Sequence, residues 1–304
     1  MEPGTERLVV VYGELAQARR LLFRGLAAIL PGLVWLAVFL IIPCLMLIAL
    51  GFASRGPYGE VSWDFTWENY KRLFGYGLMG WSADYGLILL RSFWVAGVTT
   101  LFCLLLGYPL AFFIAAQKGK WRYVWLALMV IPICTNLVIR IYAWRLILEA
   151  GSPPARIAQW IGQLPENAGL YPGAFALYIG MLSSFLPFAV LPLYTSVERL
   201  DWSIVEAAQD LFANPIRVFV HAILPQTLPG CSAAFILTFV PAAGVFVVPD
   251  LLGGAKKMLV GNLIAQQFGA SRDWPFGAAV SFALIAVMIA GLFLLPRRGR
   301  IETL

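Results

Sequence analysis

Residues 206–225 read EAAQDLFANPIRVFVHAILP, and this stretch separates two long apolar segments. The charge-free runs on either side cover residues 167–197 and 218–249, and each is long enough to cross a bilayer. A hydrocarbon core of about 30 Å requires roughly 20 helical residues. The stretch is therefore predicted to be a loop at one membrane face with helix signals of its own. Such a structured loop is typical of a surface on which a membrane protein docks a partner.

The composition of the whole chain is that of a membrane protein. Hydrophobic residues make up 61% of the chain and charged residues only 12%, whereas soluble domains have about 25% charged residues. The apolar runs predict six membrane spans, the third of which is extended past Arg140 to Trp144. The runs cover residues 25–54, 92–117, 123–139, 167–197, 218–249 and 274–296. We therefore expect an all-α protein with one six-span membrane domain over residues 25–296.

Basic residues predict the orientation of these spans. Clusters with few acidic residues lie at positions 19–24, 118–122 and 297–300, and such clusters stay on the cytoplasmic side. This rule places in the cytoplasm an N-terminal segment (1–24), the loop at about 197–228 and a tail (297–304). The net charge of +6 is then a topology signal, so no nucleic-acid partner is expected.

The sequence contains no recognisable catalytic or metal-binding set. Its four cysteines lie in separate apolar runs without C-x-x-C spacing, which is typical of small buried hydrophobes. His221 is the only histidine, and no glycine-rich phosphate loop is present. We expect no catalytic residue, no metal site and no cofactor bound by this chain.

Two short helices are predicted on the outer side. Thr66 is a candidate N-cap of the first, and the second follows Pro153 with Ile157, Trp160 and Leu164 on one face. We expect both helices to pack over the ends of the spans, although either could contact an external partner.

Arg140 interrupts the third apolar run. A straight helix that starts at Tyr123 places Arg140 about 26 Å along its axis, near the outer interface. Its side chain would then extend into the headgroup region and avoid the insertion penalty of ~2.5–3.5 kcal/mol at the bilayer centre. Arg140 and Arg145 are therefore interpreted as interfacial anchors.

The first part of the loop is predicted to form a short helix. Ser203 and Glu206 have the spacing of a capping box, in which Ser203 caps the helix and Glu206 reaches back to the Ser203 amide. The helix is expected to run to about Phe212. Glu206 and Asp210 place two carboxylates on one face, where basic side chains of a partner could meet them.

The second part of the loop carries another helix start. Asn214 is a candidate N-cap and Pro215 a candidate first helical residue, and this helix is expected to end near residues 224–225. Ala207 and Ala208 have very small side chains, so a partner could approach the backbone closely. From these residues alone, docking and simple packing beneath the spans are equally open.

The order Glu-Ala-Ala followed by Leu-Pro resembles the EAA loop of permease subunits of ATP-binding-cassette importers. In that family the loop is the coupling helix that sits in a cleft of the ATPase subunit. The resemblance implies a role in ATPase coupling for Glu206, Ala207, Ala208, Asp210, Phe212, Asn214, Pro215, Leu224 and Pro225.

Two positions depart from the family pattern. The family's glycine falls on Phe212, and its isoleucine falls on Ala222, one place before Ile223. Glycine at such a position can adopt a positive φ or allow close backbone approach. We therefore expect Asn214 and Pro215 to make the turn, and the Phe212 ring to fill an apolar hollow of the partner or of the loop itself.

Further segments resemble the spermidine/putrescine-type permeases, and together they cover most of the chain. They are LGYP (106–109), IRIYAW (139–144), VPDLLGG (248–254), GNLI (261–264) and RDWP (272–275). The resemblance implies the type I importer permease fold in a bacterial inner membrane. It also implies a heterodimer with a second permease, two ATPase subunits that hold ATP and Mg, and a periplasmic or lipoprotein substrate-binding protein.

A polyamine path should offer carboxylates and aromatic faces. Asp250, at the outer end of the fifth span, is the candidate carboxylate, and Tyr142, Trp144 and Phe246 are candidate aromatic faces. Asp250 could instead cap a helix or pair with Lys256 or Arg140, and the aromatic residues could form an interfacial belt. Arginines near the outer side do not favour a cation path.

The sequence analysis therefore predicts a transport subunit that is not itself an enzyme, with a polyamine as its substrate. The same importer class carrying an amino-acid-like compound or an organophosphonate stays open. An ion-gradient-driven secondary transporter would require a broken helix or acids at mid-bilayer in related halves of the chain, yet every acid lies near an interface. A membrane anchor for a soluble complex is a further alternative, and a membrane enzyme lacks a catalytic set.

Overall fold

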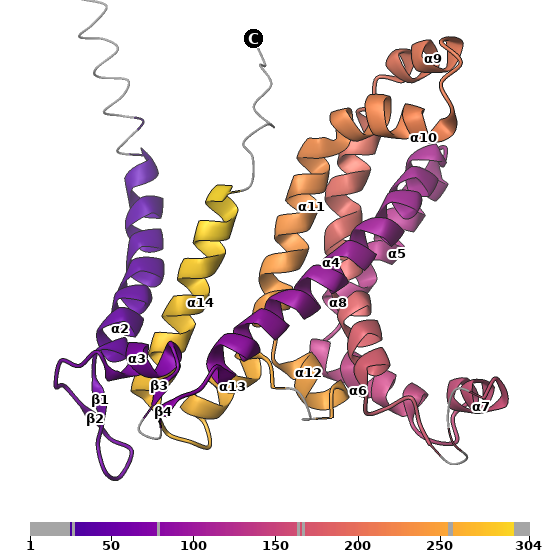
Figure 1. Ribbon diagram of the computed structural model, residues 1–304. Coiled ribbons are helices and arrows are strands. Elements are labelled where there is room, and N and C mark those ends of the chain that lie inside the picture. The colour runs from indigo at the N-terminus through magenta and orange to yellow at the C-terminus, as the bar shows by residue number, and fades with distance from the viewer. Residues whose placement is uncertain are drawn as a thin grey trace, which may run out of the picture.

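The structure, a computed structural model, describes residues 25, 28–77, 80–162, 165, 168–254 and 258–294. The predicted cytoplasmic segment 1–24 and tail 297–304 lie outside the described residues, as do Leu164 and Lys256. The described chain is mainly helical, as predicted, with two small hairpins at one end (Figure 1).

The helices differ widely in length, and two short π-helical turns (η1 and η2) run directly into longer helices. The helices are η1 (Ala37–Ile41), α2 (Ile42–Gly51), α3 (Glu68–Leu73), α4 (Asp84–Ala116), α5 (Lys120–Cys134), α6 (Leu137–Leu148), α7 (Pro153–Trp160), α8 (Ala174–Glu198), α9 (Trp202–Asp210), α10 (Pro215–Val218), η2 (Phe219–Ile223), α11 (Leu224–Gly244), α12 (Val247–Leu252), α13 (Val260–Phe268) and α14 (Trp274–Leu294). The strands pair antiparallel, β1 (Ser54–Arg55) with β2 (Val61–Ser62) and β3 (Tyr76–Gly77) with β4 (Gly80–Trp81).

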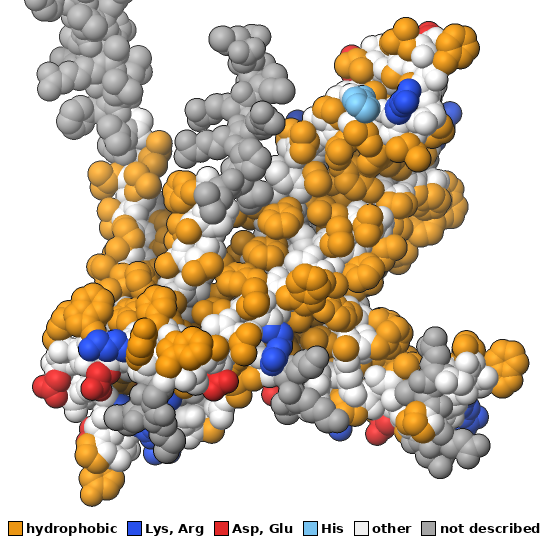
Figure 2. All heavy atoms as spheres, viewed as in Figure 1, with side chains coloured by type: hydrophobic (Ala, Val, Ile, Leu, Met, Phe, Trp, Pro, Cys, Tyr) orange, Lys and Arg blue, Asp and Glu red, His pale blue; other side chains and the backbone are white. Residues whose placement is uncertain are grey.

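The long helices account for the six predicted spans. Five continuous helices are long and apolar enough to cross a membrane: Ala28–Gly51, Asp84–Ala116, Ala174–Glu198, Pro215–Gly244 and Trp274–Phe293. The sixth is the pair α5 and α6, which passes the same test as one span but bends by 95°. Figure 2 shows hydrophobic side chains along the flanks of the long helices and most charged side chains toward the two ends.

The bend between α5 and α6 corrects the straight third span predicted from the apolar run. Thr135 is extended, and the Asn136 side chain accepts a hydrogen bond from the Val138 amide at 2.8 Å, which starts a new helix. The Arg140 guanidinium donates to the Pro132 carbonyl across the bend. The distance of Arg140 along a straight axis was therefore wrong, and this arginine stabilises the break in the span. Arg145 stacks over the Tyr171 ring, with 5.0 Å to its centroid.

The central bundle consists of α4, α8 and α11, which make the most extensive contacts in the structure. Its core contains many small side chains, and it continues into α6 and α12 at the end opposite α9. The closest approach is at Gly230 of α11, where an added Cβ would lie 2.6 Å from the Pro192 carbonyl oxygen of α8. Such small-residue contacts are typical of helix packing in lipid, where burial of apolar surface provides no driving force.

A second group of helices joins the first and last spans. Helix α14 packs against α2, α3 and α13, with a small core around Phe276 and Leu263. Arg72 of α3 forms an ion pair of 2.8 Å with the buried Asp273 that precedes α14. Helix α3 therefore packs over the spans as predicted, and Thr66 accepts a hydrogen bond of 3.2 Å from the Glu68 amide at its start.

Helix α7 and one cysteine differ from the predictions. The second outer helix forms after Pro153, but it extends to the side of the bundle (Figure 1), and its Trp160 is 89% exposed. The prediction that it packs over the span ends was wrong. All four cysteines are free, and Cys103 is buried as predicted, whereas Cys134 is exposed.

The two ends of the molecule carry different helices. One end carries α9, α10, the start of α5 and the end of α14, whereas α3, α7, α12 and α13 lie at the other (Figure 1). The basic connection 118–122 belongs to the first end. By the positive-inside rule, the end with α9 is expected to face the cytoplasm.

The close approach at Gly230 leads to a stability prediction. Replacing Gly230 with Ala places a methyl group against the Pro192 carbonyl and the Ser196 side chain. We expect destabilisation of about 1–3 kcal/mol, the usual range for overpacking, and a lower unfolding temperature in detergent. Gly97→Ala is the matched control, since nothing lies within 4 Å of a Cβ added there. Equal unfolding temperatures for the two variants would contradict this account.

Candidate functional site

The loop between α8 and α11 folds as a two-helix projection at one end of the molecule (Figure 1). Helix α9 (Trp202–Asp210) and helix α10 (Pro215–Val218) enclose a small core of Val205, Val218 and Ala222, against which Ala208 packs. Glu206, Ala207 and Asp210 are all exposed on α9. The loop therefore has an apolar base of its own and presents its carboxylates outward.

The start of α9 differs from the predicted capping box. Asp201, not Ser203, is the N-cap, because its carboxylate accepts hydrogen bonds from the Ser203 amide (3.0 Å) and the Ser203 hydroxyl (2.7 Å). These bonds, first that of the hydroxyl and then that of the amide, lower the pKa of Asp201. The Asp201 amide donates to the Gln226 side chain at 3.0 Å. The loop is thus tied back to α11 by residues that the sequence reasoning did not single out.

The turn after α9 is made by Phe212, which corrects the prediction that Asn214 and Pro215 make it. Phe212 has φ = +56°. Its amide donates to the Gln209 carbonyl (2.9 Å), and the Ala213 amide donates to the Ala208 carbonyl (3.2 Å). These two bonds define a Schellman motif, in which the residue at the position of Phe212 is usually glycine. The family's glycine therefore has a clear backbone role here.

Phe212 occupies this position although its side chain disfavours the left-handed backbone conformation that the turn requires. A left-handed conformation costs an L-residue roughly 1–2 kcal/mol. The Phe212 ring is 98% exposed, so packing within the loop does not offset that strain. The prediction that the ring fills a hollow of the loop itself was wrong.

The second loop helix begins at the predicted residues but continues past its predicted end. Asn214 accepts a hydrogen bond of 2.8 Å from the Arg217 amide, and Pro215 is the first helical residue. The helix then passes through the π-helical turn η2 into α11 and continues to Gly244. Leu224 and Pro225 thus lie inside a 30-residue helix, and the expectation that the helix ends at them was wrong.

Contacts to the bundle hold the base of the loop. The Tyr108 hydroxyl of α4 hydrogen-bonds to the Thr227 hydroxyl at 3.0 Å, and its ring packs edge-on against Phe219. Arg122, at the start of α5, forms an ion pair of 2.5 Å with Glu198 at the end of α8. Of these, the sequence had pointed only to Tyr108, as part of the LGYP segment without an assigned role.

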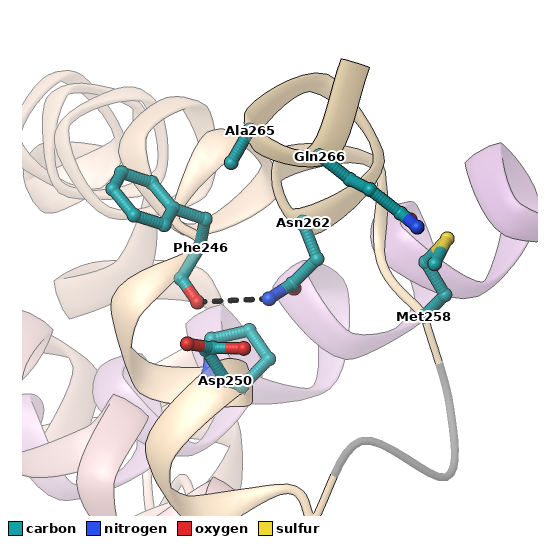
Figure 3. Close-up of a pocket in the computed structure, with 7 residues that line it drawn as sticks. Phe246, Asp250, Met258, Asn262, Ala265 and Gln266 are labelled. Atoms are coloured by element: carbon teal, nitrogen blue, oxygen red, sulfur yellow. Dashed lines mark hydrogen bonds between the residues drawn. The ribbon is translucent and has the colours of Figure 1, made fainter. Parts of the chain in front are cut away.

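A pocket lies at the opposite end, between α12 and α13. It has a volume of about 300 Å³ and is lined by Phe246, Pro249, Asp250, Met258, Asn262, Ala265 and Gln266 (Figure 3). The Asn262 side chain donates to the Phe246 carbonyl at 3.1 Å, which ties α13 to the end of α11. The lining offers an exposed carboxylate, a side-chain amide, a thioether and an aromatic ring, a set that suits an amine with an apolar stem.

The pocket unites two of the four residues predicted for a substrate path. Asp250 and Phe246 line it together, whereas Tyr142 and Trp144 lie on α6 and are not among its lining residues. Asp250 lies in the first turn of α12, a favourable place for a negative charge. It forms no ion pair with Arg140 or with another residue in the described ranges. The sequence signal for Asn262 was only the GNLI segment, and the sequence analysis did not single out Gln266.

Nothing in the described part of the chain resembles a catalytic or metal centre. No group of three or more His, Cys, Asp or Glu residues that could hold a metal ion occurs among the described residues. The geometry instead provides an apolar bundle, a projecting loop at one end and a small polar pocket at the other. This arrangement defines the membrane-spanning permease of a transport system.

The comparison with known proteins gives the family. Residues 107–297 match the family of binding-protein-dependent transport system inner membrane components. The chain belongs to this family, and it is a multi-pass inner-membrane protein.

Individual relatives and solved structures agree with this assignment. The chain is 41% identical to the spermidine/putrescine transport system permease protein PotB of Escherichia coli, covering 86% of this chain and 92% of the relative. It is 38% identical to the PotB of Haemophilus influenzae, over 88% and 91%. Its fold is similar to a chain of a bacterial ABC transporter that imports alginate (TM-score 0.70, 16% identity, 95% and 100% coverage).

The capping geometry of α9 leads to a second prediction. Asp201→Ala should increase hydrogen exchange of the backbone amides in residues 202–206, because the Ser203 amide loses its acceptor. Ser203→Ala is the matched control, since it keeps that amide bond and should change exchange less. Because the folded-state pKa of Asp201 is lowered, its stabilisation is present above the usual Asp pKa and is lost as the pH falls through the lowered value. A larger effect of Ser203→Ala, measured by mass spectrometry, would restore the capping-box interpretation.

Proposed function

We propose that this chain is one of two related permease subunits of an ATP-driven polyamine importer. The observation that carries the proposal is the 41% identity with a spermidine/putrescine permease over 86% of the chain. The proposed complex contains a second permease subunit, two ATPase subunits that bind ATP and Mg, and a periplasmic or lipoprotein binding protein. Hydrolysis takes place on the ATPase subunits, and this chain provides half of the path through the membrane.

In this proposal the two-helix loop is the docking element for the ATPase. Its exposed Glu206 and Asp210 are four residues apart on α9 and can meet basic side chains of a partner. The loop is continuous with α11, because α10, η2 and α11 form one helix from Pro215 to Gly244. A displacement of the loop by the ATPase is thereby passed directly to a membrane span.

The outer pocket is the proposed contact for the polyamine. A terminal ammonium group binds the Asp250 carboxylate, while the methylene chain lies against Phe246 and Met258. Because Asp250 is exposed, one such ion pair contributes on the order of 1 kcal/mol or less. A weak contact suits a transport path, where a ligand must leave as readily as it enters.

The other cargoes within the importer class fit the pocket less well. The described lining residues include no arginine or lysine, and an organophosphonate would need such a group for its anionic oxygens. An amino-acid-like solute could place its ammonium group on Asp250, but its carboxylate would then lack a basic partner among those residues. A dication with an apolar stem matches the lining best.

The docking role of the loop is tested by reversing one charge. Glu206→Lys should reduce uptake of radiolabelled putrescine by about tenfold or more, because a basic partner surface would repel it. The amount of protein in the membrane should not change, since Glu206 is exposed. Glu68→Lys, an exposed charge reversal on α3 at the other end, is the control and should transport normally. Undiminished uptake by Glu206→Lys would refute the docking role.

The pocket is tested by removing its negative charge. Asp250→Asn keeps the shape of the side chain but removes the attraction for an ammonium group, so the apparent KM for putrescine should rise several-fold. Asp64→Asn, an exposed acid in the loop before α3, is the control for a general loss of outer charge. Uptake kinetics in vesicles that contain the binding protein provide the measurement. An unchanged KM would remove Asp250 from the path.

A further inference from the structure

The Phe212 side chain is placed in a way that the fold of this chain does not explain. It combines a left-handed backbone (φ = +56°) with a ring that is 98% exposed. Glycine would form the same Schellman turn without steric conflict. A strained residue of this kind persists where it has a function outside the local fold, and for an exposed aromatic ring that function is contact with another molecule.

The surroundings of Phe212 form an apolar tip with an acidic flank. Leu211 is 82% exposed and Ile216 74% exposed, so three large apolar side chains gather where α9 turns into α10. Glu206 and Asp210 are exposed on α9 beside them. Figure 2 shows hydrophobic, acidic and basic side chains together at this projecting end of the molecule, where Arg217 of α10 is also exposed.

The charges decide which partner can cover this tip. Anionic lipid headgroups would be repelled by Glu206 and Asp210, which outnumber the exposed Arg217, and a second copy of this chain would present the same two carboxylates. A protein with an apolar pocket and a basic rim is complementary to the tip in both shape and charge. In the importer proposed above, the ATPase subunit is the protein that meets this loop.

We propose that Phe212 is the anchor residue of the ATPase interface: its ring inserts into an apolar pocket of the ATPase subunit, whose basic rim contacts Glu206 and Asp210. This inference rests on the proposed function and extends it to the chemistry of the docking surface. The Schellman hydrogen bonds hold the backbone of Phe212 in place before binding, so only the side-chain torsions of the ring are left to be ordered when the partner arrives.

The anchor also provides a means of partner selection. A buried aromatic anchor usually dominates the binding energy of an interface. An ATPase whose groove lacks a pocket of the right depth would meet the ring as a steric obstacle. The departure from the family glycine would therefore match this permease to its own ATPase and exclude ATPases of related importers.

The first test separates the backbone role of Phe212 from the role of its ring. Phe212→Gly relieves the strain, so the unfolding temperature of the permease should rise or stay the same. ATPase retention on the reconstituted complex, measured by dissociation in nanodiscs, should nevertheless weaken by about tenfold or more. Phe74→Ala is the matched control, since it removes a 74% exposed ring at the other end of the molecule and should leave retention unchanged.

The second test identifies the partner of the ring directly. Benzoylphenylalanine at position 212, irradiated in intact cells, should cross-link to the ATPase subunit, whereas the same probe at position 74 should not. A cross-link only to lipid, only to a second copy of this chain, or to no partner would overturn the proposal. Undiminished ATPase retention by Phe212→Gly would overturn it as well.

Failure of the Phe212 anchor and failure of the docking role of the loop give different experimental results. If Glu206→Lys releases the ATPase while Phe212→Gly retains it, the anchor is refuted and the docking loop stands. If both variants retain the ATPase and transport normally, the docking role of the whole loop is refuted together with the anchor.

Discussion

The helix from Pro215 to Gly244 is the element on which the rest of the structure depends. It contains 30 residues and is therefore about 45 Å long, enough to connect the projecting loop at one end with the pocket at the other. Phe246, which lines that pocket, follows its last residue almost directly. Between these ends, Gly230 allows the helix to lie against the α8 backbone. In the importer proposed above, a force on the loop would therefore act on a helix that reaches the pocket, and Gly230 is one of its contacts along the way.

This helix combines an irregular segment near the loop with a regular segment around Gly230. The π-helical turn Phe219–Ile223 and the nearby Pro225 and Pro229 lie at its inner end, and such irregular turns are frequent at functional sites. The Tyr108 contacts to Thr227 and Phe219 brace that same section from α4. At Gly230, by contrast, the helix lies so close to the α8 backbone that an added Cβ would meet the Pro192 carbonyl oxygen at 2.6 Å. The geometry therefore holds the middle of the helix against α8 and leaves the irregular turns at its loop end as the part that can change shape.

The sequence predicted the spans well and the ends of helices poorly, for physical reasons that differ between positions. Hydropathy reports whether a segment enters lipid but not its direction, so the 95° bend after Cys134 was missed although Thr135 and Asn136 carried a start signal. Pro225 was interpreted as a stop, yet side chains of the same helix satisfy nearby carbonyls. The Thr227 hydroxyl donates to the Ile223 carbonyl at 3.0 Å, and the π-helical turn Phe219–Ile223 directly before α11 is a local adjustment of the kind that allows proline within a membrane helix.

The two candidate sites also differ in how well they could be predicted from the sequence. The loop could be found from local spacing alone, because its residues are neighbours in sequence, although Ser203 was predicted as the N-cap and Asp201, two residues earlier, was not considered. The pocket could not be assembled in this way, because Asn262 and Gln266 reach Asp250 only after α13 has folded back against α12. Tyr142 and Trp144 were predicted with it as candidate aromatic faces, but they lie on α6, beyond the bend in the third span, and do not line the pocket.

In the proposed importer, the two ends of the long helix need contacts of opposite strength, and different structural features provide them. In the proposed importer the ATPase must be held firmly, and at the loop end the Schellman bonds, the Asn214 cap and the small core of Val205 fix the backbone that carries the exposed Phe212 ring. The proposed cargo must be released, and at the pocket end an exposed carboxylate beside one ring offers only weak contacts. The opposite arrangement would serve neither purpose, because a deeply buried charge would retain a cation and a flexible exposed loop would not transmit motion.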